Sequence, residues 1–249
     1  MDLQLRKLIS TPRTTRTCPY CGEPYPMVTY RTEHYEVTVQ GDSCVCVGFA
    51  EARSARAEAK RLREERERAA RVERAIEAIG IPPRFSGVEP DFGLASRIDG
   101  DKGLYVVGDV GSGKTTLAAA VAKAYVTRHP TATVRFTTMP DMLARIKDTY
   151  GNRGVESDVI DEYGSCALLV LDDLGKGSPT DWALERIFQL VNRRYELMLP
   201  SVITTQYSRA GLIRRLSSRG DKETAKAIVS RLKETTETLV LDGPDRRIS

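Results

Sequence analysis

The segment GDVGSGKT, from Gly108 to Thr115, has the glycine, lysine and hydroxyl spacing of a phosphate-binding loop. A strand-like run, GLYVVGD, leads into it and a helix-forming run follows, which is the context that such a loop requires. Glycines let backbone N–H groups face the phosphates, while Lys114 reaches the β- and γ-phosphates and the Thr115 hydroxyl faces Mg²⁺. The sequence therefore predicts a site for ATP and magnesium formed by Gly108, Asp109, Val110, Gly111, Ser112, Gly113, Lys114, Thr115 and Thr116.

Two adjacent carboxylates, Asp172 and Asp173, follow the apolar run LLVL at residues 168–171. Like charges at the end of a buried strand are unfavourable unless a positive group neutralises them. A strand that ends in an acid downstream of a phosphate loop is the Walker B arrangement, in which the acid holds Mg²⁺. We expect Asp172 to hold the magnesium through water and Asp173 to orient or deprotonate the attacking water. A capping role at a strand–helix turn is the alternative.

Four cysteines lie near the N-terminus as two closely spaced pairs, Cys18 with Cys21 and Cys44 with Cys46. Two such pairs of thiolates suit a tetrahedral structural Zn²⁺ site, which would explain how a small module with few large apolar residues folds. Free or redox-active thiols are the alternative. His34 lies between the pairs and is expected on the surface, because four cysteines already complete the zinc shell.

From residue 80 onward the sequence alternates strand-like and helix-like segments, which is the pattern of a parallel sheet with helical crossovers. Cys166, at the start of the third strand, is expected in the core. The expected fold class is α/β, with five parallel strands around the phosphate loop. The predicted strands are 103–109, 132–138, 166–173, 201–206 and 238–241, and the predicted helices are 114–128, 139–150, 181–198 and 222–235.

Three segments of different composition organise the 249 residues. Residues 1–48 form the predicted zinc-binding module, 49–79 an Ala/Arg/Glu-rich helical connector, and 80–249 the nucleotide-binding domain. The connector carries nine basic and six acidic side chains between 51 and 74. A solvated helix with i,i+4 ion pairs explains this composition, and a helix that contacts nucleic acid is the alternative.

The overall composition is that of a soluble globular protein, with 41% hydrophobic and 29% charged residues. A net charge of +4 permits nucleic acid as a partner but does not require it. The sequence contains no apolar run long enough to span a membrane, and its first residues have no signal-peptide core. We therefore expect a cytoplasmic protein without a membrane partner.

Seven segments, in order, resemble the DnaC/DnaI-type replicative helicase loaders of the AAA+ superfamily and their relatives, the IstB transposition-helper ATPases. The resemblance covers roughly residues 80–249. It implies an oligomeric AAA+ ATPase that binds the replicative helicase and single-stranded DNA, and a zinc module ahead of the ATPase resembles the DnaI-like layout. The segments are GIPPRF, GDVGSGKTTLAAAVA, LLVLDDLG, DWALERIFQLVNRRYE, PSVITTQYS, IVSRLKE and VLDGPDRR.

The resemblance also implies roles for residues outside the two core motifs. Arg231 matches the arginine finger, which would reach the γ-phosphate of a neighbouring subunit, so hydrolysis should need assembly into a ring or spiral. Gln206 stands where the family has a sensor asparagine, and Thr205 could share that role. Arg247, or less so Arg246, falls at the sensor-2 position. We expect no helical lid after the last strand.

The resemblance favours a loader of the replicative helicase that acts on single-stranded DNA and hydrolyses ATP slowly. Slow turnover is expected because most AAA+ motors place the longer glutamate at the position of Asp173. A transposition-helper ATPase that acts with a transposase on duplex DNA is the second interpretation, and a nucleotide-binding adaptor without turnover is the third. Arg135, Arg145 and Lys147 are candidate DNA contacts, with a solvated face as the alternative for each.

Overall fold

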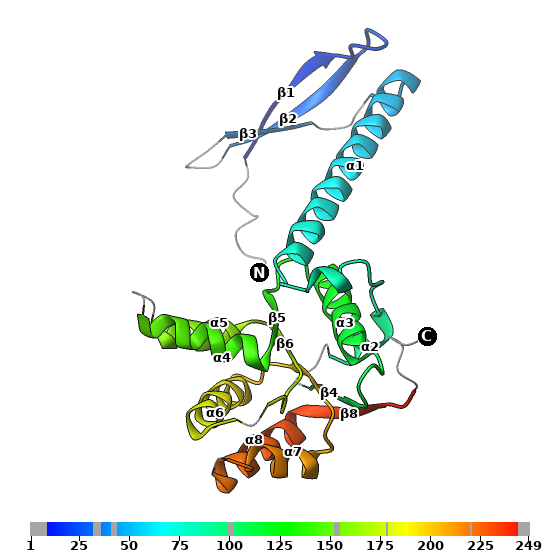
Figure 1. Cartoon of the computed structure of the whole chain (residues 1–249). Helices are drawn as coiled ribbons and strands as arrows, with labels where there is room; N and C mark the ends of the chain where they lie inside the picture. The colour runs from blue at the N-terminus through cyan, green and yellow to red at the C-terminus, as the bar shows by residue number, and fades with distance from the viewer. Residues whose placement is uncertain are drawn as a thin grey trace. The chain divides into compact units, whose positions relative to one another are not determined.

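The computed structural model describes residues 9–31, 36–40, 44–98, 102–151, 155–177, 179–219 and 221–243. The chain divides into two compact units, Met1–Glu67 and Arg68–Ser249 (Figure 1). The first contains an antiparallel sheet and the second a parallel one. None of the described helices is both long enough and apolar enough to cross a membrane.

The first unit contains a three-stranded sheet in the order β1-β2-β3. Its strands are β1 (Ile9–Thr17), β2 (Pro24–Arg31) and β3 (Glu36–Gln40). The turn between β1 and β2 holds Cys18 and Cys21. It passes through Gly22, whose φ of 78° lies in the left-handed region that glycine tolerates. The hairpin therefore presents the first cysteine pair at its tip.

Helix α1 (Val47–Glu77) follows the second cysteine pair and corresponds to the connector predicted over 49–79. The part of α1 that belongs to the first unit carries i,i+4 ion pairs, and all of their side chains are more than half exposed. Exposed pairs of this kind stabilise a helix by only about 0.3–0.5 kcal/mol each. The pairs are Lys60 with Glu64, Arg61 with Glu65, and Arg63 with Glu67. This part of the connector is thus a solvated, ion-paired helix.

The second unit is built on a five-stranded parallel sheet in the order β5-β6-β7-β4-β8. The strands are β4 (Gly103–Gly108), β5 (Val134–Thr138), β6 (Leu168–Asp172), β7 (Ser201–Thr205) and β8 (Thr236–Leu241). The predicted α/β class with five parallel strands is confirmed. Because β7 lies between β6 and β4, the carboxyl ends of these three strands meet at one edge of the sheet.

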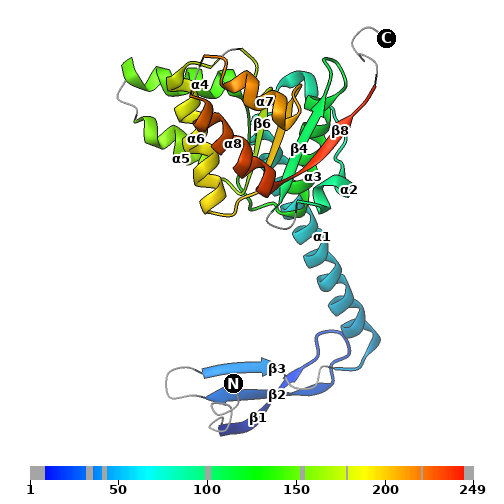
Figure 2. The same cartoon turned by 90° about the horizontal axis from the view of Figure 1, so that it is seen from below.

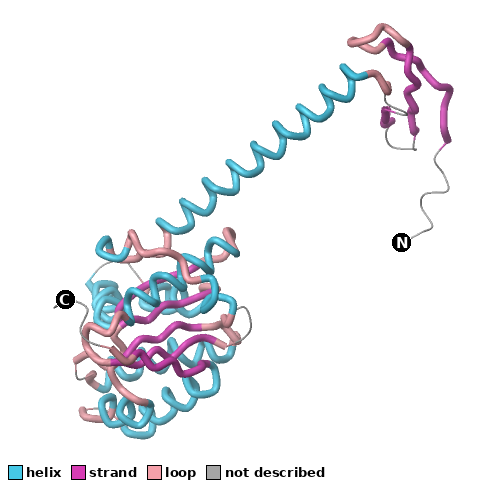
Figure 3. Tube along the Cα trace, turned by 90° about the vertical axis from the view of Figure 1, so that its right-hand side faces the viewer, coloured by secondary structure: helices cyan, strands magenta, loops and turns pink. Residues whose placement is uncertain are grey.

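Different helices cover the two faces of this sheet (Figure 2). Helix α3 (Lys114–Arg128), with α2 (Phe92–Ser96) beside it, lies on the face formed by Leu104, Val170 and Val202. The alternate residues Tyr105, Leu171 and Ile203 face a layer of five helices. These are α4 (Met139–Asp148), α5 (Glu156–Ser165), α6 (Asp181–Glu196), α7 (Arg209–Leu216) and α8 (Lys222–Thr235). Figure 3 shows the strands as a layer between helices.

Helices α5 and α7 occupy segments for which the sequence predicted no element. Each is short, at ten and eight residues, so each repeats the helical apolar period only once or twice. Val159 and Tyr163 carry the buried face of α5, and Leu212 and Leu216 that of α7. Helix α4 ends at Asp148, before the predicted end at residue 150, because a 3₁₀ turn follows it.

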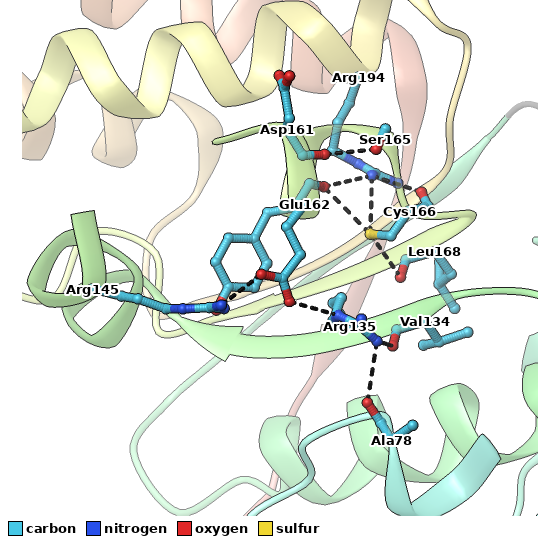
Figure 4. A network of polar contacts seen from close by, with 11 residues as sticks. Ala78, Val134, Arg135, Arg145, Asp161, Glu162, Ser165, Cys166, Leu168 and Arg194 are labelled. Atoms are coloured by element: carbon cyan, nitrogen blue, oxygen red, sulfur yellow. Dashed lines mark hydrogen bonds and ion pairs between the residues drawn. The ribbon is translucent and has the colours of Figure 1, made fainter. Parts of the chain in front are cut away.

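Arg194 of α6 is buried beside Cys166, at 3% exposure (Figure 4). Its guanidinium donates hydrogen bonds to the carbonyls of Tyr163, Cys166 and Pro200 and to the Ser201 hydroxyl. These acceptors replace the water that the charge loses, although burial still lowers the arginine pKa. The predicted core position of Cys166 is confirmed, and burial raises the pKa of its thiol. Arg194 therefore joins α6 to the strand ends opposite the phosphate loop.

Candidate functional site

The phosphate loop connects β4 to the first turn of α3. Gly111 and Gly113 adopt φ values of 79° and 94°, which side chains rarely tolerate, so the loop can turn its backbone inward. A Cβ at Gly108 would lie 2.5 Å from the Leu241 carbonyl oxygen of β8, which is too close for a side chain at this position. The Lys114 ammonium is buried and donates to the carbonyls of Gly108 and Asp109, at 2.9 and 2.7 Å. These two hydrogen bonds stabilise the conformation of the loop.

Asp172 lies at the carboxyl end of β6, directly against the start of α3. The Thr115 hydroxyl lies 3.2 and 3.0 Å from the two oxygens of its carboxylate. Burial raises the pKa of Asp172, and the neighbouring Asp173 charge adds to this, while hydrogen bonds from Thr204 and Thr115 oppose it. A hard cation prefers oxygen ligands of this kind and would restore the ionised carboxylate. Thr115 and Asp172 therefore suit Mg²⁺.

Asp173 leaves the strand in a left-handed conformation, with a φ of 57°. Its backbone N–H donates to the Thr204 hydroxyl at 2.9 Å. Its carboxylate pairs with the Lys176 ammonium at 2.8 Å. The Lys176 side chain is 64% exposed, so this ion pair is weak and can be exchanged for other partners.

A cavity of about 600 Å³ opens between the phosphate loop and Asp173, which is within the range of nucleotide pockets. It brings together Val110, Gly111, Gly113, Lys114, Thr115, Thr116, Asp173 and Gln206, all predicted from the sequence, with Arg84, Phe85 and Lys176, which were not. Arg84 and Phe85 come from a 3₁₀ turn that Pro82 and Pro83 introduce. Ser112, also predicted, does not line the cavity, and its Oγ is buried in the loop without a hydrogen-bond partner among the described residues.

Thr204, which sequence reasoning missed, connects the two acids. The pairing of Leu171 with Ile203 sets Asp172 opposite Thr204 on the neighbouring parallel strand. The buried Thr204 hydroxyl donates to Asp172 and accepts from the Asp173 N–H. Its neighbour Thr205 donates instead to the Leu174 carbonyl, at 2.6 Å. The segment SVITT does not single out Thr204 from Thr205, and only the strand order and register place Thr204 beside Asp172.

Thr204→Val is expected to lower the rate of ATP hydrolysis about tenfold, because it removes a hydrogen bond to Asp172 and leaves the Asp173 N–H without its acceptor. Thr205, which the resemblance offered as sharing the sensor role, does not line the cavity, and its hydroxyl donates to the Leu174 carbonyl. Thr205→Val is therefore the matched control: it loses a comparable buried hydrogen bond and should retain most of the activity. Steady-state hydrolysis with a magnesium titration measures both. A larger loss in Thr205→Val than in Thr204→Val would contradict this assignment.

Arg231 lies on α8, where its hydrogen bonds are to Asn192 and Ala227 rather than to the phosphate loop of its own chain. Its role as an arginine finger stays a prediction. Arg247 and Arg246, the sensor-2 candidates, lie outside the described residues.

The predicted DNA contacts Arg135 and Arg145 both pair with Glu162 of α5, at 2.9 and 2.6 Å (Figure 4). Arg135 also donates to the Ala78 carbonyl at the end of α1. The Arg145 side chain is 48% exposed, as the solvated-face alternative expects, whereas Arg135 is only partly exposed. DNA contact by either arginine stays a prediction. Lys147 lies over the Trp182 ring at 5.0 Å.

The four N-terminal cysteines converge, and all their sulfur atoms lie within 4.8 Å of one another. Cys18 and Cys46 are 3.7 Å apart and Cys21 and Cys44 are 3.4 Å apart. Tetrahedral Zn–S bonds of about 2.3 Å place sulfur atoms about 3.8 Å apart. The cluster therefore suits Zn²⁺. His34 lies outside the described residues.

Several known proteins are similar to this chain. A family model described as IstB-like ATP binding protein matches residues 92–248. The chain is 28% identical to the replicative helicase loader DnaI of Bacillus subtilis over 151 residues, which are 59% of this chain and 48% of that protein. It is 27% identical to the replicative helicase loader DnaC of Escherichia coli over 125 residues, 49% of this chain and 50% of that protein. The chain thus spans about half the length of the curated relatives it matches.

Two solved structures have the same fold. The crystal structure of DnaI gives a TM-score of 0.58 at 22% identity and covers 70% of this chain and 100% of that one. The crystal structure of the DnaC helicase loader gives 0.53 at 27% identity, with 65% and 100% covered. The architecture is therefore the AAA+ fold seen in these two proteins. Because the family model spans more than half of the sequence, including the complete phosphate loop and Asp172, this chain belongs to the IstB-like ATP-binding protein family.

Proposed function

We propose that this protein is an ATP-dependent loader that places the replicative DNA helicase on single-stranded DNA. The observation that carries the proposal is its similarity over 151 and 125 residues to DnaI and DnaC, both named replicative helicase loaders. The domain boundaries proposed are a zinc-binding module over 1–48, a helical connector over 49–79 and an AAA+ domain over 80–249. We propose assembly into a ring or spiral, in which one subunit completes the site of the next.

The pocket supports slow ATP hydrolysis. Thr115 and Asp172 would hold Mg²⁺, which would neutralise charge on the phosphates. Lys114 would exchange the carbonyls of Gly108 and Asp109 for the β- and γ-phosphates. Asp173 would orient or deprotonate the attacking water once its carboxylate is released from Lys176, and this requirement adds to the expectation of slow turnover.

Residues beyond the phosphate loop would stabilise the transition state. Gln206 lines the cavity, and its amide would hold the attacking water or the γ-phosphate. Arg231 from a neighbouring subunit would neutralise the charge that develops on the transferred phosphoryl group. We propose Arg247 as a sensor-2 residue on the resemblance alone.

The cysteine cluster would hold a structural zinc ion, and the module around it would engage the helicase. Cys18, Cys21, Cys44 and Cys46 already have the mutual distances of a tetrahedral thiolate site. Exposed Tyr20, Val45 and Val47 beside the cluster offer apolar contact area.

Removal of the metal is expected to unfold the first unit and leave the second intact, because the two units have separate cores and only the first depends on the cysteines. EDTA treatment followed by exchange into zinc-free buffer with magnesium restored should remove one zinc per chain, abolish helicase binding and leave ATP affinity unchanged within twofold. Metal analysis, helicase co-elution and nucleotide titration measure the three effects. An unchanged far-UV circular dichroism spectrum with helicase binding retained would contradict the structural role of zinc.

Gel filtration with the replicative helicase tests the loader proposal. Zinc-loaded full-length protein should co-elute with the helicase in the presence of ATP, and single-stranded DNA should stimulate hydrolysis more than duplex DNA does. No co-elution, with or without ATP, would rule out a loader.

A transposition-helper ATPase is the second candidate, and the IstB-like family model favours it. This activity predicts binding to a transposase and preference for duplex DNA. The same gel-filtration and DNA-stimulation assays, repeated with the transposase and duplex DNA, therefore distinguish the two functions.

A further inference from the structure

Arg231 lies in a cradle formed by one face of α6. Phe188, Asn192 and Tyr195 follow each other at helical spacing of four and three residues, so they line the same side of the helix. The Arg231 guanidinium carbon lies 4.9 Å from the centre of the Phe188 ring and 5.5 Å from that of Tyr195. Both distances are within the range of cation–π contacts. An arginine that is half-buried between two rings has lost much of its rotamer freedom.

Asn192 fixes the remaining freedom of this guanidinium. Its side-chain oxygen accepts a hydrogen bond from Arg231 Nε at 2.8 Å. Its amide nitrogen donates to Glu196 at 2.8 Å, one turn further along α6. An amide has one acceptor oxygen and one NH₂ group, so the bond to Glu196 keeps the oxygen turned toward Arg231. Two consecutive hydrogen bonds thus connect Glu196, Asn192 and Arg231 and fix the orientation of the guanidinium.

These hydrogen bonds do not involve the Nη2 end of the Arg231 guanidinium. Among the described residues, the hydrogen bonds of Arg231 use Nε, to Asn192, and Nη1, to the Ala227 carbonyl of its own helix. Nη2 takes part in neither. A planar guanidinium held by two of its nitrogen atoms presents the third in a fixed direction.

We infer that Asn192 is a positioning residue for the arginine finger, with Phe188 and Tyr195 as its aromatic support. The inference rests on the proposed function of Arg231. A finger that is already oriented before subunits meet loses less conformational entropy when it reaches a neighbouring γ-phosphate, so more of the interaction contributes to the rate.

Asn192→Ala, Phe188→Leu and the control Gln189→Ala test this role in the full-length protein. Gln189 is an amide on the same helix, lines the same surface hollow as Phe188 and Asn192, and makes no hydrogen bond to Arg231. At a concentration where the protein is assembled, Asn192→Ala and Phe188→Leu should each lower kcat about five- to tenfold. KM for ATP and the oligomeric state should stay unchanged, and Gln189→Ala should match the parent protein in all three.

Mixed assemblies separate the finger from the site that it serves. Lys114→Ala subunits cannot hydrolyse ATP but still present a finger, whereas Arg231→Ala subunits retain a complete pocket and lack one. Adding Lys114→Ala subunits to Arg231→Ala subunits should restore hydrolysis. Adding the double variant Lys114→Ala/Asn192→Ala should restore about five- to tenfold less.

The possible failures are distinguishable. If Arg231→Ala is impaired while Asn192→Ala and Phe188→Leu keep full kcat, the positioning role is wrong and the proposed finger stands. If Arg231→Ala itself keeps full kcat, the proposed finger is wrong. If the fall in kcat of Asn192→Ala is accompanied by a rise in KM for ATP of the same size, or by a matching loss of assembled protein, the role of Asn192 is structural. The inference is then overturned.

Discussion

Lys114→Ala is expected to abolish nucleotide binding, which makes it one of the two substitutions with the largest effects. The ammonium is buried and already interacts with two carbonyl oxygens of the phosphate loop. A triphosphate would replace these partners with charged oxygens, and a hydrogen bond between charged groups is roughly twice as strong as one between neutral groups. The substitution therefore removes the principal cation of the pocket and also the two hydrogen bonds that stabilise the loop. We expect ATP affinity to fall by at least about 100-fold.

Isothermal titration calorimetry or a fluorescent nucleotide measures this loss. Lys226→Ala is a suitable control, because Lys226 is an exposed lysine paired with Glu223 on α8. It should bind ATP as the parent protein does. Retained ATP affinity in Lys114→Ala, in a protein whose far-UV circular dichroism is unchanged, would mean that the loop has been misinterpreted.

Arg231→Ala is expected to reduce kcat by about 10³-fold while ATP affinity stays within twofold of the parent value. Arginine fingers contribute on this scale because they neutralise charge that develops only in the transition state. Hydrolysis by the parent protein should also rise more steeply than linearly with protein concentration, since each site would depend on a neighbour.

Two substitutions serve as controls for this experiment. Arg231→Lys keeps the charge but not the planar fork, and should recover only part of the lost rate. Arg214→Ala removes an exposed arginine from α7 and should leave hydrolysis unchanged. Hydrolysis by Arg231→Ala at the parental rate, or a parental rate strictly proportional to concentration, would exclude a finger supplied by another subunit.

The parts of the site that are local in sequence could be predicted from it. The phosphate loop is a continuous segment whose glycine positions and lysine are set by the geometry of a single turn. Asp172 was predictable because an apolar run that ends in an acid is informative without knowledge of its neighbours. The cysteine pairs were predictable for the same reason, since two short spacings suffice to suggest four ligands.

The parts that depend on pairing between distant segments could not be predicted. Thr204 reaches Asp172 only because β7 lies next to β6 in a particular register. Arg84 and Phe85 line the cavity because a turn before β4 in sequence folds back over the loop. Arg194 lies on the buried face of α6, at helical spacing from Ile187 and Leu190. Carbonyl oxygens at the end of α5 and before β7 accept its hydrogen bonds there, and the sequence of α6 does not reveal these partners.

The left-handed backbone conformation at Asp173 restricts which residues can replace this aspartate during evolution. At a φ of 57°, aspartate and asparagine are the residues with side chains that adopt the conformation most readily. Glutamate would bring its carboxylate closer to a bound phosphate but fits this backbone less well. A change toward a faster motor would therefore need the turn after β6 to be rebuilt together with the side chain. The shape of one peptide turn would thus help to keep ATP turnover slow, as the loader proposal expects.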